Sequence, residues 1–181
     1  IFNTETRKCK NCDQISYLSK NIPVVEDSFS QVFSPETAYQ MTSMLEGVVK
    51  RGTGKKLKDL NLDLAGKTGT TNKNTDTWFI GFSSKLVIGV YVGFDEPKPL
   101  GKYETGAKTA MPIFKEFVKK AIKKKDARPF KVADNITLMV IDRITGEKAT
   151  NSTKDIIVEA FKKNYIKNGN NQNLEIKNRL K

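Results

Sequence analysis

The residues best suited to chemistry in this sequence stand in a row: Lys67, Thr68, Gly69 and Thr70. Together they supply a cation, two hydroxyl groups and backbone N–H groups beside a residue that has no side chain. Such a set can hold an anion next to a reacting carbonyl group. The residues follow an apolar stretch and precede a polar turn, which predicts that they end a strand. On the four residues alone, a strand edge that runs into a solvated turn explains the pattern equally well.

The chain contains no histidine, so Ser-His-Asp and Cys-His chemistry cannot be completed within it. A nucleophile would need a lysine, a carboxylate or a neighbouring segment as its base. Cys9 and Cys12 form a C-x-x-C pair. A zinc site would need two further nitrogen or sulfur ligands, which the chain lacks. We expect a short-range disulfide formed in an oxidising compartment, or two free thiols. No metal site and no cofactor is expected.

The sequence of 181 residues carries a net charge of +12, with lysine as the main cation. The lysines are spread along the chain, and no module signature for DNA or RNA accompanies them, so we expect no nucleic-acid partner. There is no apolar run of about eighteen residues and no signal peptide. Because the first residues are polar and aperiodic and the chain begins at Ile1, we interpret it as a piece of a longer protein.

A helix is predicted to begin at Ser34-Pro35-Glu36, where a capping serine, a proline and an acidic residue follow one another. It is expected to end near Gly52 and to face the core with a stripe at helical spacing. The members of that stripe are Ala38, Met41, Met44, Leu45, Val48 and Val49. Three antiparallel strands are then predicted: Asn61 to Thr70, Asp76 to Phe82 and Leu86 to Phe94.

A second helix is predicted over residues 108–124, with an apolar face and a lysine-rich face. The apolar face is formed by Ile113, Phe114, Phe117, Val118, Ala121 and Ile122. These elements predict an α+β fold in which an antiparallel sheet is flanked by helices. Beyond it, residues 136–142 are predicted to form a strand, followed by a turn at 143–146 and a weak return strand. We therefore divide the chain into a loop region (1–33), a main domain (34–128), a small β extension (129–161) and a disordered tail (162–181).

Two further motifs carry a less specific signal. The run Gly52-Thr53-Gly54-Lys55 invites a phosphate-loop interpretation, but Lys55 is followed by Lys56 and no strand precedes the glycines, so nucleotide binding is not expected. Trp78, beside Phe79, can be a substrate platform. An aromatic residue in a central strand is more often a core residue, which is our expectation, although Trp78 is near enough to the motif to border a cleft.

The segment from Lys67 to Thr70 resembles the K-T-G element of the penicillin-recognising serine enzymes. From Ser34 onward the chain resembles a class A, bifunctional penicillin-binding protein of Gram-negative type, in order and spacing, over roughly residues 34–145. The resembling stretches are Ser34–Leu45, Leu64–Thr71, Asp76–Phe82, Val90–Asp95 and Gly101–Ala107 leading to Pro112–Phe114. The resemblance implies an incomplete transpeptidase domain that belongs to a peptidoglycan D,D-transpeptidase.

The resemblance also implies roles and partners. Lys67 and the Thr70 hydroxyl would bind the free carboxylate of a stem peptide, the Thr70 N–H would face the oxyanion, and Gly69 would let the acyl group lie along the strand. Thr68 is expected to point to the opposite face and pack. Stem peptides and β-lactams would be the ligands. The parent would carry a glycosyltransferase domain and a membrane anchor that hold it on the periplasmic face of the inner membrane.

The resemblance breaks down at two further motifs. No Ser-x-x-Lys sequence with the acylated serine occurs, and Ser-x-Asn is absent where the family has it. Both are expected upstream of Ile1, so the isolated chain is expected to be inactive. Two alternatives stay open: a non-catalytic module that binds cell wall or protein, and a β-lactamase, which uses the same motifs but would turn penicillin over.

Overall fold

The computed structural model describes residues 8–10, 24–26 and 31–163. The chain forms two compact units, Ile1–Ser34 and Pro35–Lys181. In the first, strands β1 (Lys8–Lys10) and β2 (Val24–Glu26) pair antiparallel, with Cys9 opposite Val25. The sequence predicted irregular structure here, so this short pair is a correction. Cys12 lies outside the described residues, and the disulfide stays a prediction.

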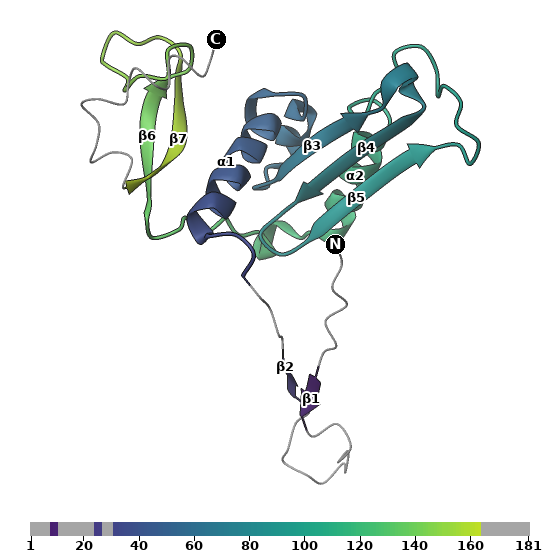
Figure 1. Cartoon of the computed structure of the whole chain (residues 1–181), viewed down its shortest axis with the longest axis horizontal. Helices are drawn as coiled ribbons and strands as arrows, with labels where there is room; N and C mark the ends of the chain where they lie inside the picture. Colours follow the sequence, from purple (N-terminus) through teal and green to yellow (C-terminus); the bar gives the residue numbers. More distant parts are fainter. Residues whose placement is uncertain (1–7, 11–23, 27–30, 164–181) are drawn as a thin grey trace. The chain divides into compact units, whose positions relative to one another are not determined.

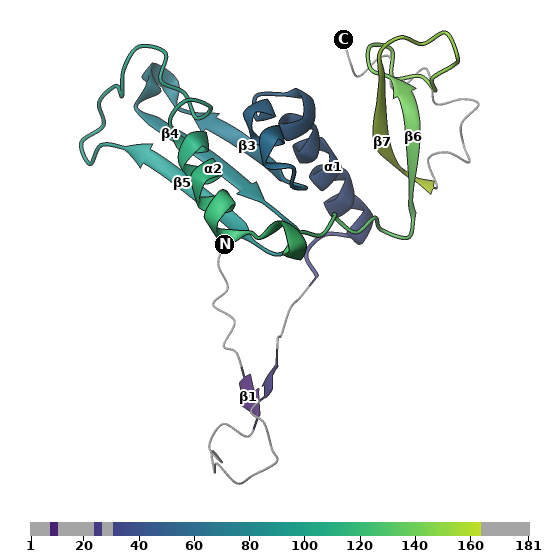
Figure 2. The same cartoon turned by 180° about the vertical axis from the view of Figure 1, so that it is seen from behind.

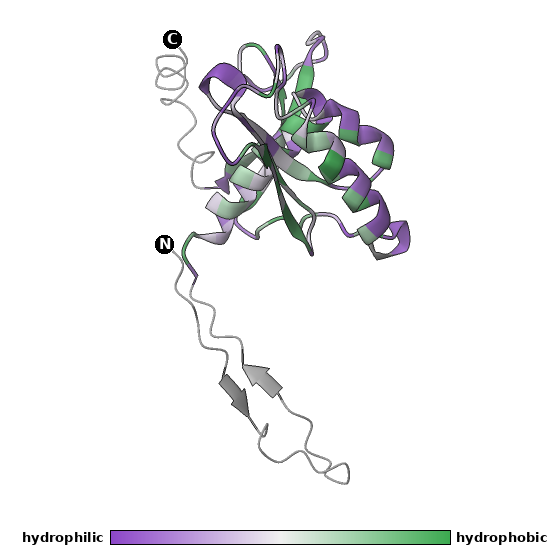
Figure 3. Ribbon diagram, turned by 90° about the vertical axis from the view of Figure 1, so that its right-hand side faces the viewer, coloured by the Kyte–Doolittle hydropathy of each residue, from purple (hydrophilic) through white to green (hydrophobic). Residues whose placement is uncertain are grey.

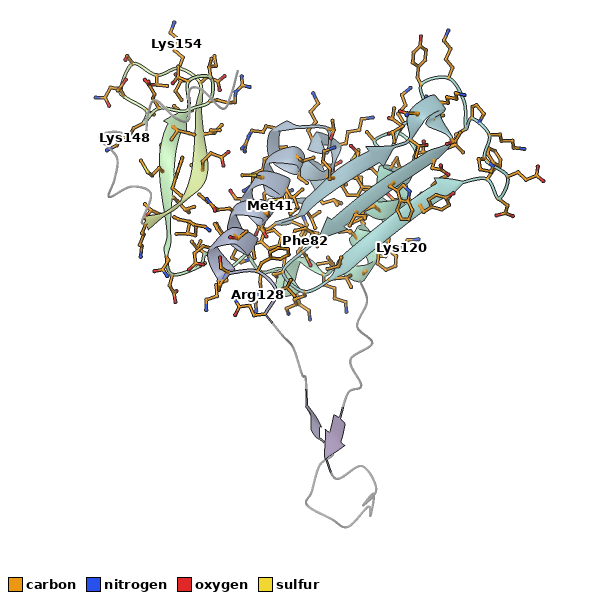
Figure 4. The ribbon with its side chains drawn as sticks, viewed as in Figure 1. Met41, Phe82, Lys120, Arg128, Lys148 and Lys154 are labelled. Atoms are coloured by element: carbon orange, nitrogen blue, oxygen red, sulfur yellow. The ribbon has the colours of Figure 1, made fainter. Side chains whose placement is uncertain are left out.

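The second unit begins with helix α1 (Pro35–Arg51), which starts and ends as predicted. The expected core-facing stripe is only partly buried. Val49 is 3% exposed, whereas Met41 and Met44 are 51% and 56% exposed, and Ala38 is exposed as well. Met41 can be located on α1 in Figure 4. The core expectation is therefore wrong for the first half of the stripe, because helical spacing groups residues on a face but does not supply a covering partner.

The 3₁₀ helix η1 (Lys55–Leu60) and strand β3 (Ala65–Thr70) follow α1. The predicted strand was to start at Asn61. Instead Asn61 is the C-cap of η1 with a left-handed φ of 52°, and its N–H donates to Lys58 O. Asparagine is one of the few residues that adopt this conformation readily. The strand therefore begins four residues later, while Leu64 is buried in the core.

Strands β4 (Asp76–Phe82) and β5 (Val87–Gly93) complete a three-stranded antiparallel sheet in the order β3-β4-β5. Figure 1 shows the three strands side by side. A short 3₁₀ helix, η2 (Asn72–Asn74), joins β3 to β4. The register sets Gly69 opposite Trp78 and Thr70 opposite Thr77. Along β4, burial alternates: Thr77 and Phe79 are fully buried, and Trp78 and Ile80 are exposed. One face of the sheet is therefore the core face.

Helix α2 (Ala110–Ala121) covers that core face, as the view from behind shows (Figure 2). The Phe114 ring packs on the Phe79 ring with centroids 4.7 Å apart. The core cluster also includes Val49, Leu57, Leu64, Ala110, Met111 and Val118. Hydrophobic residues accordingly concentrate in the strands and alternate with hydrophilic ones along the helices (Figure 3). The apolar face of α2 is only partly covered, because Ile113 and Phe117 are 53% and 50% exposed.

After the 3₁₀ helix η3 (Lys124–Asp126), strands β6 (Ile136–Asp142) and β7 (Ile156–Lys162) form an antiparallel hairpin. The predicted strand, turn and return strand are thus confirmed. The hairpin is held to α1 by Gln40 Nε2 donating to Ala160 O at 3.0 Å and by an Arg51–Glu159 ion pair at 2.5 Å.

Lys162, assigned to the tail from the sequence, belongs to β7, and residues 164–181 lie outside the described part of the chain. Within that described part, none of the helices combines the length and the apolar character needed to cross a membrane.

Candidate functional site

The candidate site is an open edge of the sheet. Strand β3 pairs with β4 along one side, and among the described residues no strand pairs with its other side. Residues in an antiparallel strand direct their N–H and C=O groups alternately to the two sides. An open edge therefore keeps backbone donors and acceptors available for an extended chain that adds alongside it. All four residues singled out from the sequence lie on this strand.

Lys67 carries its charge at this edge. Its side chain is exposed, and Nζ donates to Thr68 O at 3.0 Å and lies 3.4 Å from Thr68 Oγ1. No ion pair joins Lys67 to a carboxylate within the described residues. The ammonium group therefore has neutral partners in the structure, and its charge is available to an incoming anion.

Thr68 lies on the expected face of the strand but makes contacts that the sequence did not predict. It is half-buried, and its hydroxyl oxygen lies 3.4 Å both from Lys67 Nζ and from Thr53 Oγ1. Thr68 stands opposite the buried Phe79, whereas Lys67 stands opposite the exposed Ile80, so the two side chains start from opposite faces of the strand as expected. The contact between the Lys67 ammonium group and the Thr68 oxygen atoms was not expected. The sequence did not predict that Thr53 contacts the motif, because Thr53 was considered only as part of the phosphate-loop pattern. The turn at the glycines brings Thr53 beside β3, and no local sequence pattern indicates a contact of this kind.

The same turn resolves the phosphate-loop pattern. Gly52 N and Gly54 N both donate to Val48 O, at 3.0 and 2.9 Å. The glycines therefore close the C-terminal end of α1, which is a common use of glycine. They do not follow a strand or open an α-helix as the glycines of a Walker loop do.

Trp78 borders the motif and is not a core residue as expected. It is 41% exposed, stands opposite Gly69, and packs against Tyr91 with ring centroids 4.8 Å apart. A Cβ atom on Gly69 would lie 3.2 Å from Trp78 Cβ, tighter than most such contacts. The absence of a side chain at position 69 thus leaves this part of the strand surface unobstructed.

Thr70 is the last residue of β3, and its hydroxyl group is hydrogen-bonded to the loop before α2. Its hydroxyl oxygen accepts a hydrogen bond from the Gly106 N–H at 3.1 Å. Immediately after it, Thr71 N donates to Asp76 O at 3.0 Å and closes the turn. The Asp76 carboxylate accepts from Tyr91 at 2.7 Å and from Thr75 at 3.0 Å. These hydrogen bonds lower the pKa of Asp76 below its ordinary value of 3.8, and the bond from Tyr91 has the largest effect.

The motif does not line either of two cavities found elsewhere. One, of about 140 Å³, lies between the β4–β5 turn and the end of α2. The other, of about 360 Å³, lies between the first turns of α1 and residues 130–134. The candidate site is thus an exposed strand edge that offers hydrogen bonds and charge.

A family model for the penicillin-binding protein transpeptidase domain matches residues 24–119, which is more than half of the chain. The chain therefore belongs to this transpeptidase family. It is 42% identical over 169 residues to penicillin-binding protein 1A of Rickettsia prowazekii, covering 92% of this chain and 21% of that relative. It is 43% identical over 133 residues to penicillin-binding protein 1A of Pseudomonas aeruginosa, covering 73% of this chain and 16% of that relative.

Among solved structures, the crystal structure of penicillin-binding protein 1A from Haemophilus influenzae matches with a TM-score of 0.64 and 34% identity. The match covers 72% of this chain and 20% of that chain. The resemblance stated from the sequence and the α+β fold are both confirmed. The chain spans about a fifth of the length of these relatives.

Proposed function

We propose that this chain is the C-terminal part of a D,D-transpeptidase domain whose parent cross-links peptidoglycan stem peptides through an acyl-serine intermediate. The observation that carries the proposal is the exposed Lys67 ammonium on the open edge of β3, without a carboxylate partner among the described residues. A protein of this family acts on a peptide with a free terminal carboxylate, and an uncommitted cation beside an unpaired strand is suited to bind it.

The chemistry assigns a role to each residue of the edge. Lys67 and the Thr70 hydroxyl hold the terminal carboxylate of the donor peptide, and the peptide lies along β3 as an added strand over Gly69. A serine outside this chain attacks the scissile carbonyl, whose developing oxyanion faces the Thr70 N–H. D-alanine leaves, and the amine of an acceptor peptide then attacks the acyl ester and regenerates the serine.

Other features of the parent are part of the same proposal. It would carry an N-terminal glycosyltransferase domain and a membrane anchor, and it would act on the periplasmic face of the bacterial inner membrane. The similarity to proteins named penicillin-binding protein 1A supports this assignment. Fractionation of cells that express the full-length parent would test it, and recovery of the protein from the cytoplasm would contradict it.

The catalytic proposal is tested on the full-length parent with a fluorescent penicillin. We expect covalent labelling of the unmodified parent, and a rate of acylation roughly tenfold to a hundredfold lower for Lys67→Ala, the cost of a charged hydrogen bond. Lys85→Ala is the matched control, because Lys85 is an exposed lysine on the β4–β5 turn.

Three results would oppose the proposal. An unlabelled parent excludes an acyl-serine mechanism with penicillin. Equal effects of the two lysine variants favour a non-catalytic binding module. Steady release of hydrolysed penicillin favours a β-lactamase over a stably acylated transpeptidase.

A further inference from the structure

Gly106 lies closer to the candidate site than its place in the sequence suggests. It is buried, and a Cβ atom at this position would lie 2.4 Å from Trp78 O and 2.6 Å from Gly69 O. Both atoms belong to the backbone of a directly paired position of β3 and β4. Backbone atoms in a paired sheet cannot move aside, so only glycine allows the loop to approach the back of the strand this closely.

The approach gives the Thr70 hydroxyl a fixed donor. The Gly106 N–H donates to Thr70 Oγ1 at 3.1 Å, a good geometry for this kind of bond. A threonine hydroxyl has one proton to donate and lone pairs that accept. Within the described residues the Thr70 hydroxyl has no acceptor for its proton. Thr77 stands directly opposite Thr70, yet its buried hydroxyl has no hydrogen-bond partner there either.

The loop that carries Gly106 is tied to two neighbouring elements and is also braced by a hydrogen bond within itself. Leu100 N donates to Asn74 O at 2.9 Å, which joins the loop to the turn after β3. The Thr109 hydroxyl donates to Glu104 Oε2 at 2.9 Å, across the residues that flank Gly106. Met111 N donates to Gly106 O at 2.8 Å, which joins the loop to the first turn of α2. Gly106 is therefore held on both sides of its N–H group.

We infer that Gly106 is a positioning residue: its N–H occupies an acceptor site of the Thr70 hydroxyl and so directs the proton of that hydroxyl to the carboxylate of the substrate. The inference rests on the proposed function, because it needs a carboxylate at the edge of β3. It adds a residue of the loop before α2 to the residues that set specificity, although Gly106 itself does not touch the substrate. Without this bond the hydroxyl can rotate and direct its proton elsewhere.

The test measures how strongly the full-length parent prefers a substrate that has a free carboxylate. Acylation rate constants are determined for a penicillin with a free carboxylate and for its methyl ester, and their ratio is the carboxylate preference. We expect Thr70→Val to lower this ratio about tenfold, the range of a lost charged hydrogen bond. Gly106→Ala, which pushes the loop off the sheet, is expected to lower it to a similar extent, and the double variant no further.

Gly89→Ala is the matched control, because the nearest atom to a Cβ at Gly89 is Ile80 Cγ1 at 4.0 Å. Its ratio should equal that of the unmodified parent. A merely structural role for Gly106 would lower both rate constants together and leave the ratio unchanged, which would overturn the inference. So would a ratio that falls in Thr70→Val but not in Gly106→Ala. An unmodified parent that is not acylated at all overturns the proposed function instead.

A second variant covers the case in which Gly106→Ala does not fold. Thr109→Val removes the bond to Glu104 without placing new atoms against the sheet. It should lower the carboxylate preference severalfold while the parent remains folded. An unchanged ratio in folded Thr109→Val would overturn the inference.

Discussion

At the scale of single residues, Phe114 and Phe117 show how one turn of a helix separates two environments. Both lie on α2, but Phe114 is fully buried against Phe79 and Phe117 is half exposed. We expect Phe114→Ala to lower the free energy of unfolding by about 3–5 kcal/mol, because it leaves a cavity in the core. Phe117→Ala, the matched control, should cost less than about 1 kcal/mol. Urea unfolding of both variants measures the difference, and equal losses would contradict the packing described.

The residue types at the site were more predictable than their contacts. Lys67 and Thr70 could be singled out because a cation and a hydroxyl group at a strand end are suited to hold an anion, a role that stays part of the proposal. The contact between Thr68 and Lys67 could not be predicted. Strand alternation places the two side chains on opposite faces and takes no account of a long lysine side chain that bends around an open edge. Trp78 was misassigned for a related reason. Its strand is apolar on both faces, and the pattern does not say which face is covered.

At the scale of elements, the β3–β4 turn and β5 form one hydrogen-bonded group around Asp76. The Tyr91 hydroxyl donates to this carboxylate, as do the hydroxyls of Thr75 and Thr71. The bond to Asp76 in turn raises the pKa of Tyr91 above its ordinary value of 10.0. Because Thr71 follows Thr70 directly, this group fixes the end of the candidate site.

The hydrogen bonds around Asp76 lead us to expect that the stability of the fold falls at acidic pH. The folded-state pKa of Asp76 is lowered, so its contribution to stability is present above about pH 4 and is lost as pH falls through the folded-state pKa, below 3.8. We expect Asp76→Asn to lower the Tm at pH 7 and to differ less from the unmodified protein at pH 3. Thermal melts at the two pH values measure this. A difference of the same size at both would contradict the prediction.

Tyr91→Phe gives an independent check on the same group, because it removes the largest cause of the shift. The pKa of Asp76, followed by NMR, should move back toward 3.8. The tyrosine itself behaves in the opposite sense: its raised pKa means that its contribution is present below pH 10 and is lost as pH rises beyond that value.

Elements with strong local signals were predicted almost to the residue. Helix α1 begins at a Ser-Pro-Glu start and ends at a glycine, and β4 and β6 have the predicted bounds. Strand β3 was predicted too long because Asn61 to Ala65 alternates like a strand, whereas the left-handed Asn61 and the preceding 3₁₀ helix depend on contacts of Leu57 and Leu64 with the core. Short-range patterns do not carry that information.

At the scale of the whole molecule, the part of the described chain that contains α1 and the three-stranded sheet exposes two apolar surfaces, apart from the apolar side chains exposed on the β6–β7 hairpin. One lies on α1 and contains Met41 and Met44. The other is the face of the sheet opposite α2 and contains Trp78, Ile80, Val87 and Tyr91. Exposed patches of this kind mark surfaces that other groups cover. Since the chain spans about a fifth of its relatives, we propose that residues outside it cover both surfaces in the parent.

The isolated chain is therefore expected to bind a hydrophobic dye such as ANS and to melt over a broad range. Replacing Met41 and Met44 together with lysine should lower dye binding, because it removes one of the two surfaces. The same change at the buried position Met111, which is 1% exposed, should raise it by loosening the core. A monodisperse chain with a sharp cooperative melt and no dye binding would contradict the prediction.

The open edge of β3 also bears on aggregation. An unpaired strand that can accept an extended peptide can equally accept the strand of another copy, and natural proteins discourage this by placing lysine on such edges. Lys67 would therefore do two things: attract the carboxylate of a substrate and keep identical edges apart by charge repulsion. Removing it would weaken binding and favour association of copies at once.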